Sequence, residues 1–229
     1  MSINVVERVD DLVKVQNILV SVSDKGGLEQ FIPALVEINP QIRIFSTGGT
    51  HGRIREILGD SAASRLMQVS DYTGQPETQG GLVKTLDFKI YLGLLTETYN
   101  DAHQGDLARA GGVPIDMVVV NLYPFKETIS KPDVTVEQAR GNIDIGGPCM
   151  IRASAKNYIR VASVVDPADY GQILSDLKAN QGSTSLDLRF QLARKAFEHT
   201  AVYDRTIADF LVSKAIDDVK TCYQLEKKE

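Results

Sequence analysis

The sequence predicts an α/β fold, with a Rossmann-type parallel sheet flanked by helices and a helical extension toward the C-terminus. Three observations support this prediction. A strand, a glycine turn and a helix follow one another twice within residues 17–58. Residues 116–125 centre on an apolar run of the kind found in strands buried on both faces. Residues 185–215 contain neither Gly nor Pro, which predicts a long helix.

Length and composition indicate one globular domain over residues 1–229, with residues 1–16 as a polar lead-in. The net charge of −5 and the pI near 5.3 argue against bulk electrostatic binding to nucleic acid or to a membrane. Neither a transmembrane run nor a signal-peptide pattern is found, so we expect a cytoplasmic protein. The two cysteines and three histidines have no disulfide or metal-ligand spacing, so a protein-bound metal is not expected.

The first strand–turn–helix unit begins with an apolar strand at residues 17–23. The strand ends at Ser23, Asp24 and Lys25, two glycines follow, and apolar residues then recur at helical spacing from Leu28. Such a turn offers backbone N–H groups and a helix N-terminus to an anion, and Lys25 adds a full charge. A tight turn with a solvated lysine is the alternative interpretation.

The second unit repeats this pattern, with a strand at residues 41–45 and a helix at residues 51–58. Its turn contains Ser46, Thr47, Gly48, Gly49 and Thr50. Ligands of open α/β sheets bind beyond the carboxyl ends of the strands, so two such turns on adjacent strands predict one pocket rich in N–H and O–H donors. Phosphate is the group that fits such a pocket best.

The remaining elements follow from shorter patterns. We expect a short strand at residues 67–70, a strand at 116–125 and a last strand at 161–165, with helices at 101–109, 135–140 and 170–178. Residues 87–99 fit a strand or a buried loop. Asn121 and Tyr123 stand at the carboxyl end of the central strand, where site residues are expected. The alternative for Tyr123 is a residue that caps the core.

Residues 142–157 combine a carboxylate, two glycines and a proline with a helix expected from about Pro148 to Lys156. Asp144 and Lys156 are therefore a candidate acid/base pair near a helix N-terminus. Eight residues of helix span roughly 12 Å, so the two side chains share a site only if substrate lies between them or the chain folds back. A helix start with Asp144 as a polar loop residue is the alternative.

The Gly- and Pro-free stretch at about residues 185–215 carries an apolar stripe at helical spacing. Its length exceeds that of the usual globular helix, so we expect it to pack across a partner subunit. His199 lies within the stripe and is interpreted as a core or interface residue.

Nine motifs, taken in order, resemble the IMP cyclohydrolase domain of the bifunctional purine-biosynthesis protein. The resemblance extends from about residue 17 to residue 212. The motifs are at residues 21–25 (Ser-Val-Ser-Asp-Lys), 46–50 (Ser-Thr-Gly-Gly-Thr), 69–74 (Val-Ser-Asp-Tyr-Thr-Gly), 83–86 (Val-Lys-Thr-Leu), 121–125 (Asn-Leu-Tyr-Pro-Phe), 142–147 (Asn-Ile-Asp-Ile-Gly-Gly), 155–157 (Ala-Lys-Asn), 166–167 (Asp-Pro) and 195–204 (Lys-Ala-Phe-Glu-His-Thr-Ala-Val-Tyr-Asp).

The resemblance implies a methylglyoxal-synthase-like fold, a homodimer, and dehydrative closure of the formamido carboxamide ribonucleotide FAICAR to IMP, the last step of de novo purine biosynthesis. It implies catalytic positions at Lys84, Tyr123, Asp144 and Lys156. By the same resemblance the nucleotide, chiefly its phosphate, binds to Ser23, Asp24, Lys25, Thr47, Gly48, Gly49 and Thr50, and the remainder to Thr85, Val120, Asn121 and Ile145.

The chemistry agrees with these positions. An oxyanion grows on the formyl oxygen as the carboxamide nitrogen attacks, and preorganised donors stabilise it by a few kcal/mol each, roughly. We expect Asp144 and Lys156 to transfer protons, and Lys84 and Tyr123 to orient the substrate and stabilise the oxyanion. Holding both arms of one molecule in contact lowers the barrier without a cofactor, and activity is expected to survive EDTA.

The sequence departs from the family at three positions, where Leu82, Asp87 and Tyr91 replace an arginine and two histidines. Leucine cannot bind an anion as a guanidinium does, so compensation by Arg53 or Lys89 is expected. Because no transformylase domain follows, formyl transfer is expected on a separate protein. The rival interpretations are methylglyoxal synthase and a regulatory, nucleotide-binding module on the same fold.

Overall fold

The computed structural model describes residues 5–76 and 84–226. Its centre is a five-stranded parallel sheet in the order β4-β3-β2-β5-β6. The strands are β2 (Asn17–Val22), β3 (Arg43–Ser46), β4 (Leu66–Gln68), β5 (Met117–Asn121) and β6 (Ala162–Val164). The predicted α/β fold with a parallel sheet is therefore confirmed.

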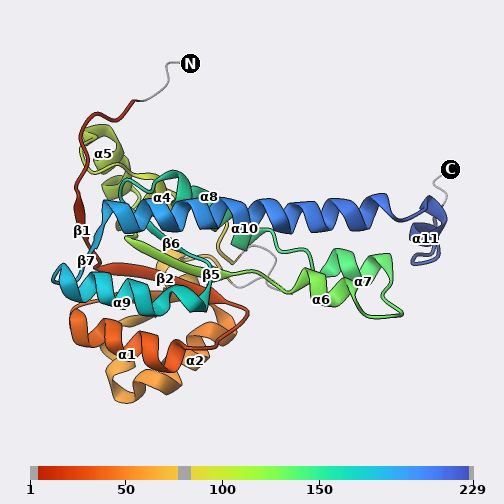
Figure 1. Cartoon of the computed structure of the whole chain (residues 1–229), viewed down its shortest axis with the longest axis horizontal. Coiled ribbons are helices and arrows are strands. Elements are labelled where there is room, and N and C mark those ends of the chain that lie inside the picture. The colour runs from red at the N-terminus through yellow and green to blue at the C-terminus, as the bar shows by residue number, and fades with distance from the viewer. Residues whose placement is uncertain (1–4, 77–83, 227–229) are drawn as a thin grey trace.

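Helices cover both faces of this sheet (Figure 1). One face carries α1 (Leu28–Ile38), α2 (Gly48–Leu58) and α9 (Tyr170–Ala179), and the other carries α4 (Phe88–Leu95), α8 (Gly146–Lys156) and α10 (Leu186–Val212). Alternate residues of each central strand point to opposite faces of the sheet. In β2, Leu19 packs in the apolar cluster that includes residues of α8, and Ile18 and Val20 pack in the cluster that includes residues of α1. Both faces of the central strands β2 and β5 are thus buried, which explains their nearly continuous apolar runs.

Shorter elements complete the part of the chain that the structure describes. They are α3 (Val69–Thr73), α5 (Asp101–Arg109), α6 (Phe125–Ile129), α7 (Val136–Gly141), α11 (Ile216–Lys220), two 3-10 helices (Gly59–Ser64 and Pro167–Asp169), and an antiparallel pair formed by β1 (Leu12–Lys14) and β7 (Ser183–Ser185). Part of the expected lead-in is therefore a strand, because residues 12–14 pair with residues 183–185.

The segment from residue 87 onward corrects one expectation. Instead of a strand or buried loop, it forms helix α4. The side chain of Asp87 accepts the backbone N–H of Lys89 at 2.8 Å and caps the helix. Ile90, Gly93 and Leu94 are the buried residues, and their spacing of three and four is helical. The apolar residues at every second position favoured a strand, whereas the cap and this buried face favour the helix.

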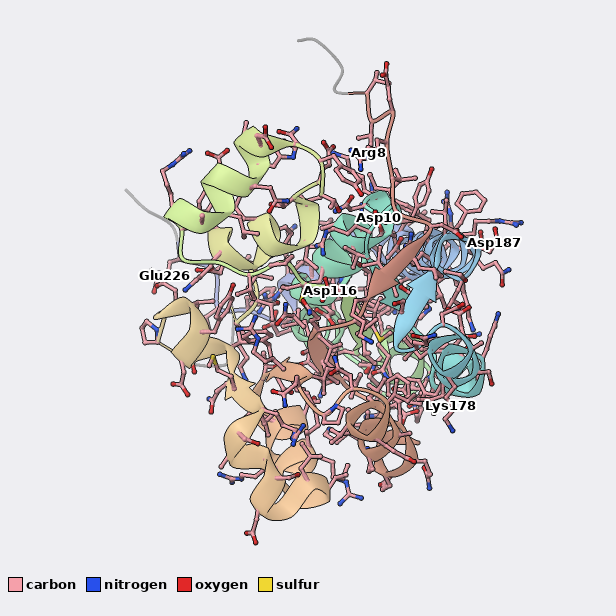
Figure 2. The ribbon with its side chains drawn as sticks, turned by 90° about the vertical axis from the view of Figure 1, so that its left-hand side faces the viewer. Arg8, Asp10, Asp116, Lys178, Asp187 and Glu226 are labelled. Atoms are coloured by element: carbon pink, nitrogen blue, oxygen red, sulfur yellow. The ribbon has the colours of Figure 1, made fainter. Side chains whose placement is uncertain are left out.

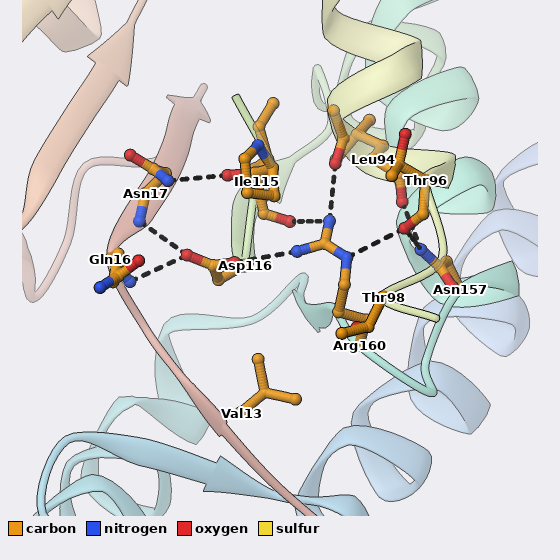
Figure 3. A network of polar contacts seen from close by, with 12 residues as sticks. Val13, Gln16, Asn17, Leu94, Thr96, Thr98, Ile115, Asp116, Asn157 and Arg160 are labelled. Atoms are coloured by element: carbon orange, nitrogen blue, oxygen red, sulfur yellow. Dashed lines mark hydrogen bonds and ion pairs between the residues drawn. The ribbon is translucent and has the colours of Figure 1, made fainter. Parts of the chain in front are cut away.

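A buried ion pair fixes the amino end of the sheet (Figure 3). Arg160 Nη1 lies 2.9 Å from Asp116 Oδ1, and both side chains are buried. The other Arg160 donors bind the carbonyl oxygens of Gly93, Thr96 and Ile115. Asp116 Oδ2 accepts two backbone N–H groups at the start of β2. Asp116 lies inside the molecule, whereas Lys178 and Asp187 are exposed at its periphery (Figure 2). The network is satisfied by protein groups, so we assign it a structural role.

Helix α10 has 27 residues and extends well past the sheet, with α11 at its far end (Figure 1). It begins where the Ser185 side chain accepts the Leu188 N–H. Its first half contacts α8 and β6. Leu211 and Val212 near its end are exposed. In the part of the chain that the structure describes, no helix is both long and apolar enough to span a membrane.

Candidate functional site

A cavity of about 360 Å³ lies at the carboxyl edge of the sheet, beyond β2, β3 and β5. Of the residues predicted from the sequence, it is lined by Ser23, Lys25, Thr47, Gly48, Gly49, Thr50, Lys84, Thr85, Val120, Asn121, Tyr123, Asp144 and Ile145. A second cavity of similar volume, lined by residues 5–9, 97–100 and 159–160, contains none of the predicted residues. The parallel topology collects the predicted side chains because every strand ends at the same edge.

One end of the cavity is built to hold an anion. The N–H groups of Thr50 and His51 bind the carbonyl oxygen of Thr47, and those of Gly48 and Gly49 have no acceptor among the residues that the structure describes. A Cβ placed on Gly48 would lie 3.1 Å from Lys84 Nζ. The helix N-terminus therefore combines free N–H groups with an adjacent ammonium group, which suits a phosphate.

Lys25 also lies beside this N-terminus. A Cβ placed on Gly49 would lie 3.9 Å from Lys25 Cε. Lys25 Nζ lies 3.3 Å from the carbonyl oxygen of Ser23. Glycine is required at residue 48, where φ is +43° and a side chain would meet the Lys84 ammonium. The second strand–turn–helix unit thus brings a helix N-terminus close to two lysines that are 59 residues apart in the sequence.

The hydroxyl groups of the two turns hold the turns together. Thr50 Oγ1 donates to the carbonyl oxygen of Val22 at 3.0 Å and accepts the Val22 N–H at 3.1 Å. Ser21 Oγ and Thr47 Oγ1 are 2.9 Å apart. These contacts fix the distance between β2 and α2. Thr50 therefore influences the shape of the cavity indirectly, by holding the backbone of Val22 in place.

Asn121 shapes the first turn in a similar way. Its Oδ1 accepts the N–H groups of Ser23 and Asp24 at 2.6 and 2.9 Å, and its Nδ2 donates to the carbonyl oxygen of Asp24 at 2.8 Å. Asp24 in turn accepts the Gly26 N–H through Oδ1. Asp24 is absent from the cavity lining and stabilises the turn that presents Lys25.

Asp144 lines the same cavity and lies just before α8. Its Oδ1 accepts the Gly147 N–H at 2.9 Å, and its own N–H donates to the Tyr203 hydroxyl at 2.9 Å. Burial raises the pKa of the Asp144 carboxyl, while the N–H groups of Gly147 and Tyr123 act in the opposite direction. A carboxylate with a raised pKa is closer to the range in which it exchanges protons at neutral pH.

Gly146 and Gly147 have close neighbours that leave no space for a side chain at either position. A Cβ on Gly147 would lie 2.6 Å from Asp144 Oδ2 and from Leu122 Cδ2, and one on Gly146 would lie 2.8 Å from Thr85 Oγ1. The helix α8 can therefore begin beside Thr85 and Asp144 only if both residues lack side chains. Tyr123 and Ile145 also line the cavity and are 56% and 57% exposed, so Tyr123 is not a core residue.

Lys156 is the one predicted catalytic residue that does not line the cavity. It is the last residue of α8 and is exposed. Gly146, the first residue of that helix, lies about 15 Å away at 1.5 Å per residue. Within one chain the fold thus separates Lys156 from Asp144, as the spacing in the sequence indicated.

Of the three residues that depart from the family pattern, the structure describes Asp87 and Tyr91. Asp87 is the N-cap of α4, and Tyr91 is partly buried against the core beside α8, so neither lines the cavity. Leu82 lies outside the described residues. Arg53, expected to compensate for Leu82, forms ion pairs with Glu29 and Glu56. Lys89 donates to the carbonyl oxygen of Tyr72 at 2.8 Å.

Tyr203 was not predicted as a site residue, although its hydroxyl holds the backbone of Asp144. The two residues are 59 positions apart, and the sequence pattern marks Tyr203 only as part of the apolar stripe of α10. Among the described residues, no group of three or more His, Cys, Asp or Glu side chains is placed to hold a metal ion.

Comparison with known proteins identifies the family. Residues 27–149, more than half of the chain, match the model of the MGS-like domain. The chain belongs to the MGS-like domain family. Residues 154–229 of this MGS-like chain match the model of the AICARFT/IMPCHase bienzyme. The methylglyoxal-synthase-like fold expected from the motifs is confirmed.

Relatives of the MGS-like chain include two bifunctional purine biosynthesis proteins PurH. That of Bacillus subtilis is 46% identical over 199 residues, which cover 87% of this chain and 37% of the relative. That of Thermoanaerobacter sp. is 48% identical over 196 residues, covering 86% and 37%. The chain corresponds to the N-terminal portion of PurH and spans little more than a third of its length. The predicted relationship is therefore confirmed.

One solved structure is similar to this chain over nearly the whole length of the solved protein. The crystal structure of ForH matches with a TM-score of 0.71 and 30% sequence identity, and the match covers 86% of this MGS-like chain and 98% of ForH. This structure extends little beyond the part that it shares with the present chain.

Proposed function

We propose that this chain is an IMP cyclohydrolase that closes FAICAR to IMP with loss of water. The observation that carries the proposal is the cavity of about 360 Å³, whose lining includes both an anion site and Asp144. Its lining includes every residue that the resemblance to the IMP cyclohydrolase domain assigns to nucleotide binding and catalysis, except Asp24 and Lys156. The identity of 46–48% to PurH over this portion supports the same conclusion.

The phosphate binds at the N-terminus of α2. The N–H groups of Gly48 and Gly49 and the side chains of Lys25 and Lys84 supply the donors. Ser23, Thr47 and Thr85 add hydroxyl groups along the cavity. The ribose and base then extend past Val120 and Asn121 toward Asp144 and Ile145. Because the anchored phosphate fixes one end of the substrate, the reacting arms are held together near Asp144.

Ring closure forms a bond between the carboxamide nitrogen and the formyl carbon. Asp144 accepts the proton that the nitrogen loses, and its raised pKa suits this role. Lys84 and Tyr123 stabilise the negative charge that develops on the formyl oxygen. The formyl oxygen needs two protons before the C–O bond breaks and water leaves. Asp144 returns the proton that it took from the carboxamide nitrogen, and Lys156 is the proposed source of the other. The formamido nitrogen loses its own proton as the C=N bond forms, and this proton restores the charge of Lys156.

The exposed position of Lys156 leads to a proposal about assembly. Since this residue lies at the far end of α8 in its own chain, it reaches the cavity only from a second copy. We therefore propose a homodimer. The cytoplasmic location, the absence of a cofactor and the formyltransferase on a separate protein stay predictions.

The alternative function is a regulatory module that binds a purine nucleotide without converting it. One observation favours it: a single chain does not bring Lys156 to Asp144. Methylglyoxal synthase is less favoured, because residues 154–229 match the bienzyme model.

The decisive experiment mixes the purified protein with FAICAR and follows IMP by its ultraviolet absorbance. Wild-type protein is expected to form IMP, whereas Asp144→Asn is expected to lose about 10²- to 10⁴-fold in kcat. Lys156→Ala is expected to lose turnover but to retain nucleotide binding, measured by calorimetry with IMP. Binding of IMP without turnover by the wild type would favour the regulatory module instead.

A further inference from the structure

Tyr203 connects the long helix α10 to the loop that carries Asp144. It lies near the middle of α10 and is 9% exposed. Its hydroxyl oxygen accepts the backbone N–H of Asp144 at 2.9 Å and lies 3.5 Å from the carbonyl oxygen of Asn142. Its ring meets Phe125 edge-on, with centroids 6.2 Å apart. The hydroxyl therefore has one strong partner, and packing holds the ring in place.

The contact matters because it holds the backbone of Asp144, whereas the N–H groups of Gly147 and Tyr123 act on its carboxyl group. The carboxylate is held by the Gly147 N–H at 2.9 Å, and the backbone is held by Tyr203. Among the described residues, the Asp144 N–H has Tyr203 as its acceptor. Without this acceptor a partly buried N–H would lose its hydrogen bond, and the loop would gain freedom to move the carboxylate.

We propose that Tyr203 is a positioning residue for Asp144, so that α10 takes part in setting the geometry of the reaction. This inference rests on the proposed cyclohydrolase function. It assigns to the C-terminal helix a role besides packing: one hydroxyl group on the helix holds the proton acceptor in register with the substrate.

The chain offers a closely matched control in Tyr72. Like Tyr203, Tyr72 is 9% exposed, and its hydroxyl accepts a backbone N–H at 2.9 Å, that of Val113. Tyr72 is absent from the lining of the candidate cavity. The two Tyr→Phe variants remove the same kind of hydrogen bond, but only one of these bonds reaches Asp144.

The experiment compares Tyr203→Phe, Tyr72→Phe and wild-type protein in the FAICAR assay, with urea unfolding as the measure of stability. Tyr203→Phe is expected to lower kcat by about 10- to 100-fold and to leave KM within about twofold, because ground-state binding does not need Asp144 in register. Tyr72→Phe is expected to lose similar stability and to keep the wild-type kcat. Equal kcat values for both variants would overturn the proposal.

A second measurement separates this inference from the proposed function. Amide hydrogen exchange at residues 142–147 reports the loop directly and needs no turnover. Faster exchange confined to this segment in Tyr203→Phe is expected, and unchanged exchange would overturn the role of Tyr203. If wild-type protein failed to form IMP, the proposed function would fall, while the exchange result would still decide whether Tyr203 holds the loop.

Discussion

At the scale of single residues, two lysines lie near the N-terminus of α2 and give the candidate site its positive end. Lys25 and Lys84 lie beside Gly49 and Gly48. The strand–turn pattern indicated the position of Lys25 and of the glycine turn, because parallel strands end at one edge. Lys84 was assigned to the site by the resemblance to the IMP cyclohydrolase domain. The contact between Asp144 and Tyr203 could not be predicted in this way, since no local pattern links residues 59 positions apart.

Removal of the Lys25 charge is expected to weaken substrate binding. Lys25→Ala should raise KM by about 10- to 100-fold, the loss typical of a charge-assisted contact to phosphate, with kcat within about threefold of wild type. Steady-state kinetics over a range of FAICAR concentrations measures both constants. Lys178→Ala, an exposed lysine on α9, serves as the control. A defect in kcat alone would contradict the assignment of Lys25 to the phosphate.

Gly147 permits a test of the Asp144 geometry that leaves every charged group in place. In Gly147→Ala the added Cβ would lie 2.6 Å from Asp144 Oδ2, so the carboxylate must move. We expect kcat to fall by about 10²-fold or more while IMP binding, measured by calorimetry, persists.

The matched control is Gly171→Ala in helix α9, where an added Cβ meets no atom within 4 Å. This variant is expected to keep its activity and to gain up to about 1 kcal/mol in the free energy of unfolding. A wild-type kcat in Gly147→Ala would show that the position of the Asp144 carboxylate does not limit the reaction.

At the scale of elements, buried Arg189 anchors α10 to the rest of the molecule. Its side chain is fully buried and donates to the carbonyl oxygens of Asp10, Asp11, Tyr158, Ile159 and Thr184. One guanidinium therefore joins the segment before β1, the middle residue of β7, and the loop before β6 to α10. A planar group with five N–H donors suits this task, and lysine would not replace it.

Arg189→Met is expected to lower the free energy of unfolding by about 3 kcal/mol or more, because several buried carbonyl groups lose their donor. Urea denaturation at constant pH measures the change. Arg205→Met on the same helix is the control, since the Arg205 side chain is 75% exposed, and this change should alter stability by less than about 0.5 kcal/mol. An equal effect of both substitutions would contradict the role given to Arg189.

Elements that carry their own signal were predicted, and elements defined by distant contacts were not. The strands near residues 17, 43 and 117 are apolar runs closed by turns, so their residues suffice to identify them. Helix α4 was misjudged because apolar residues at every second position competed with the Asp87 cap. Strands β1 and β7 have three residues each and gain their structure from pairing across the chain, which no local pattern reports.

At the scale of the whole molecule, the proposed dimer makes a test by complementation possible. If Lys156 of one copy serves the cavity of the other, then Asp144→Asn and Lys156→Ala damage opposite halves of a shared site. The two variants are to be unfolded, mixed in equal amounts, refolded and assayed with FAICAR. In a mixed dimer one site has both residues intact, so random pairing should restore about one quarter of wild-type activity.

Each variant refolded alone is the control, and both are expected to be inactive. If the mixture showed no recovery although mixed dimers had formed, Lys156 would not act across an interface. Ultracentrifugation of the mixture, with one variant carrying a fluorescent label, establishes whether such dimers are present.

The pairing of β1 with β7 also bears on how the chain matures during synthesis. Val13 pairs with Thr184, 171 residues later, so the first strand has no partner until most of the protein has left the ribosome. At roughly 5–20 residues per second, this delay is on the order of 10–30 seconds. Arg189 lies four residues after the end of β7, and its carbonyl contacts form at nearly the same stage. Strand β1 therefore pairs late in synthesis, and a nascent chain halted before residue 183 leaves its backbone groups open to proteases and chaperones.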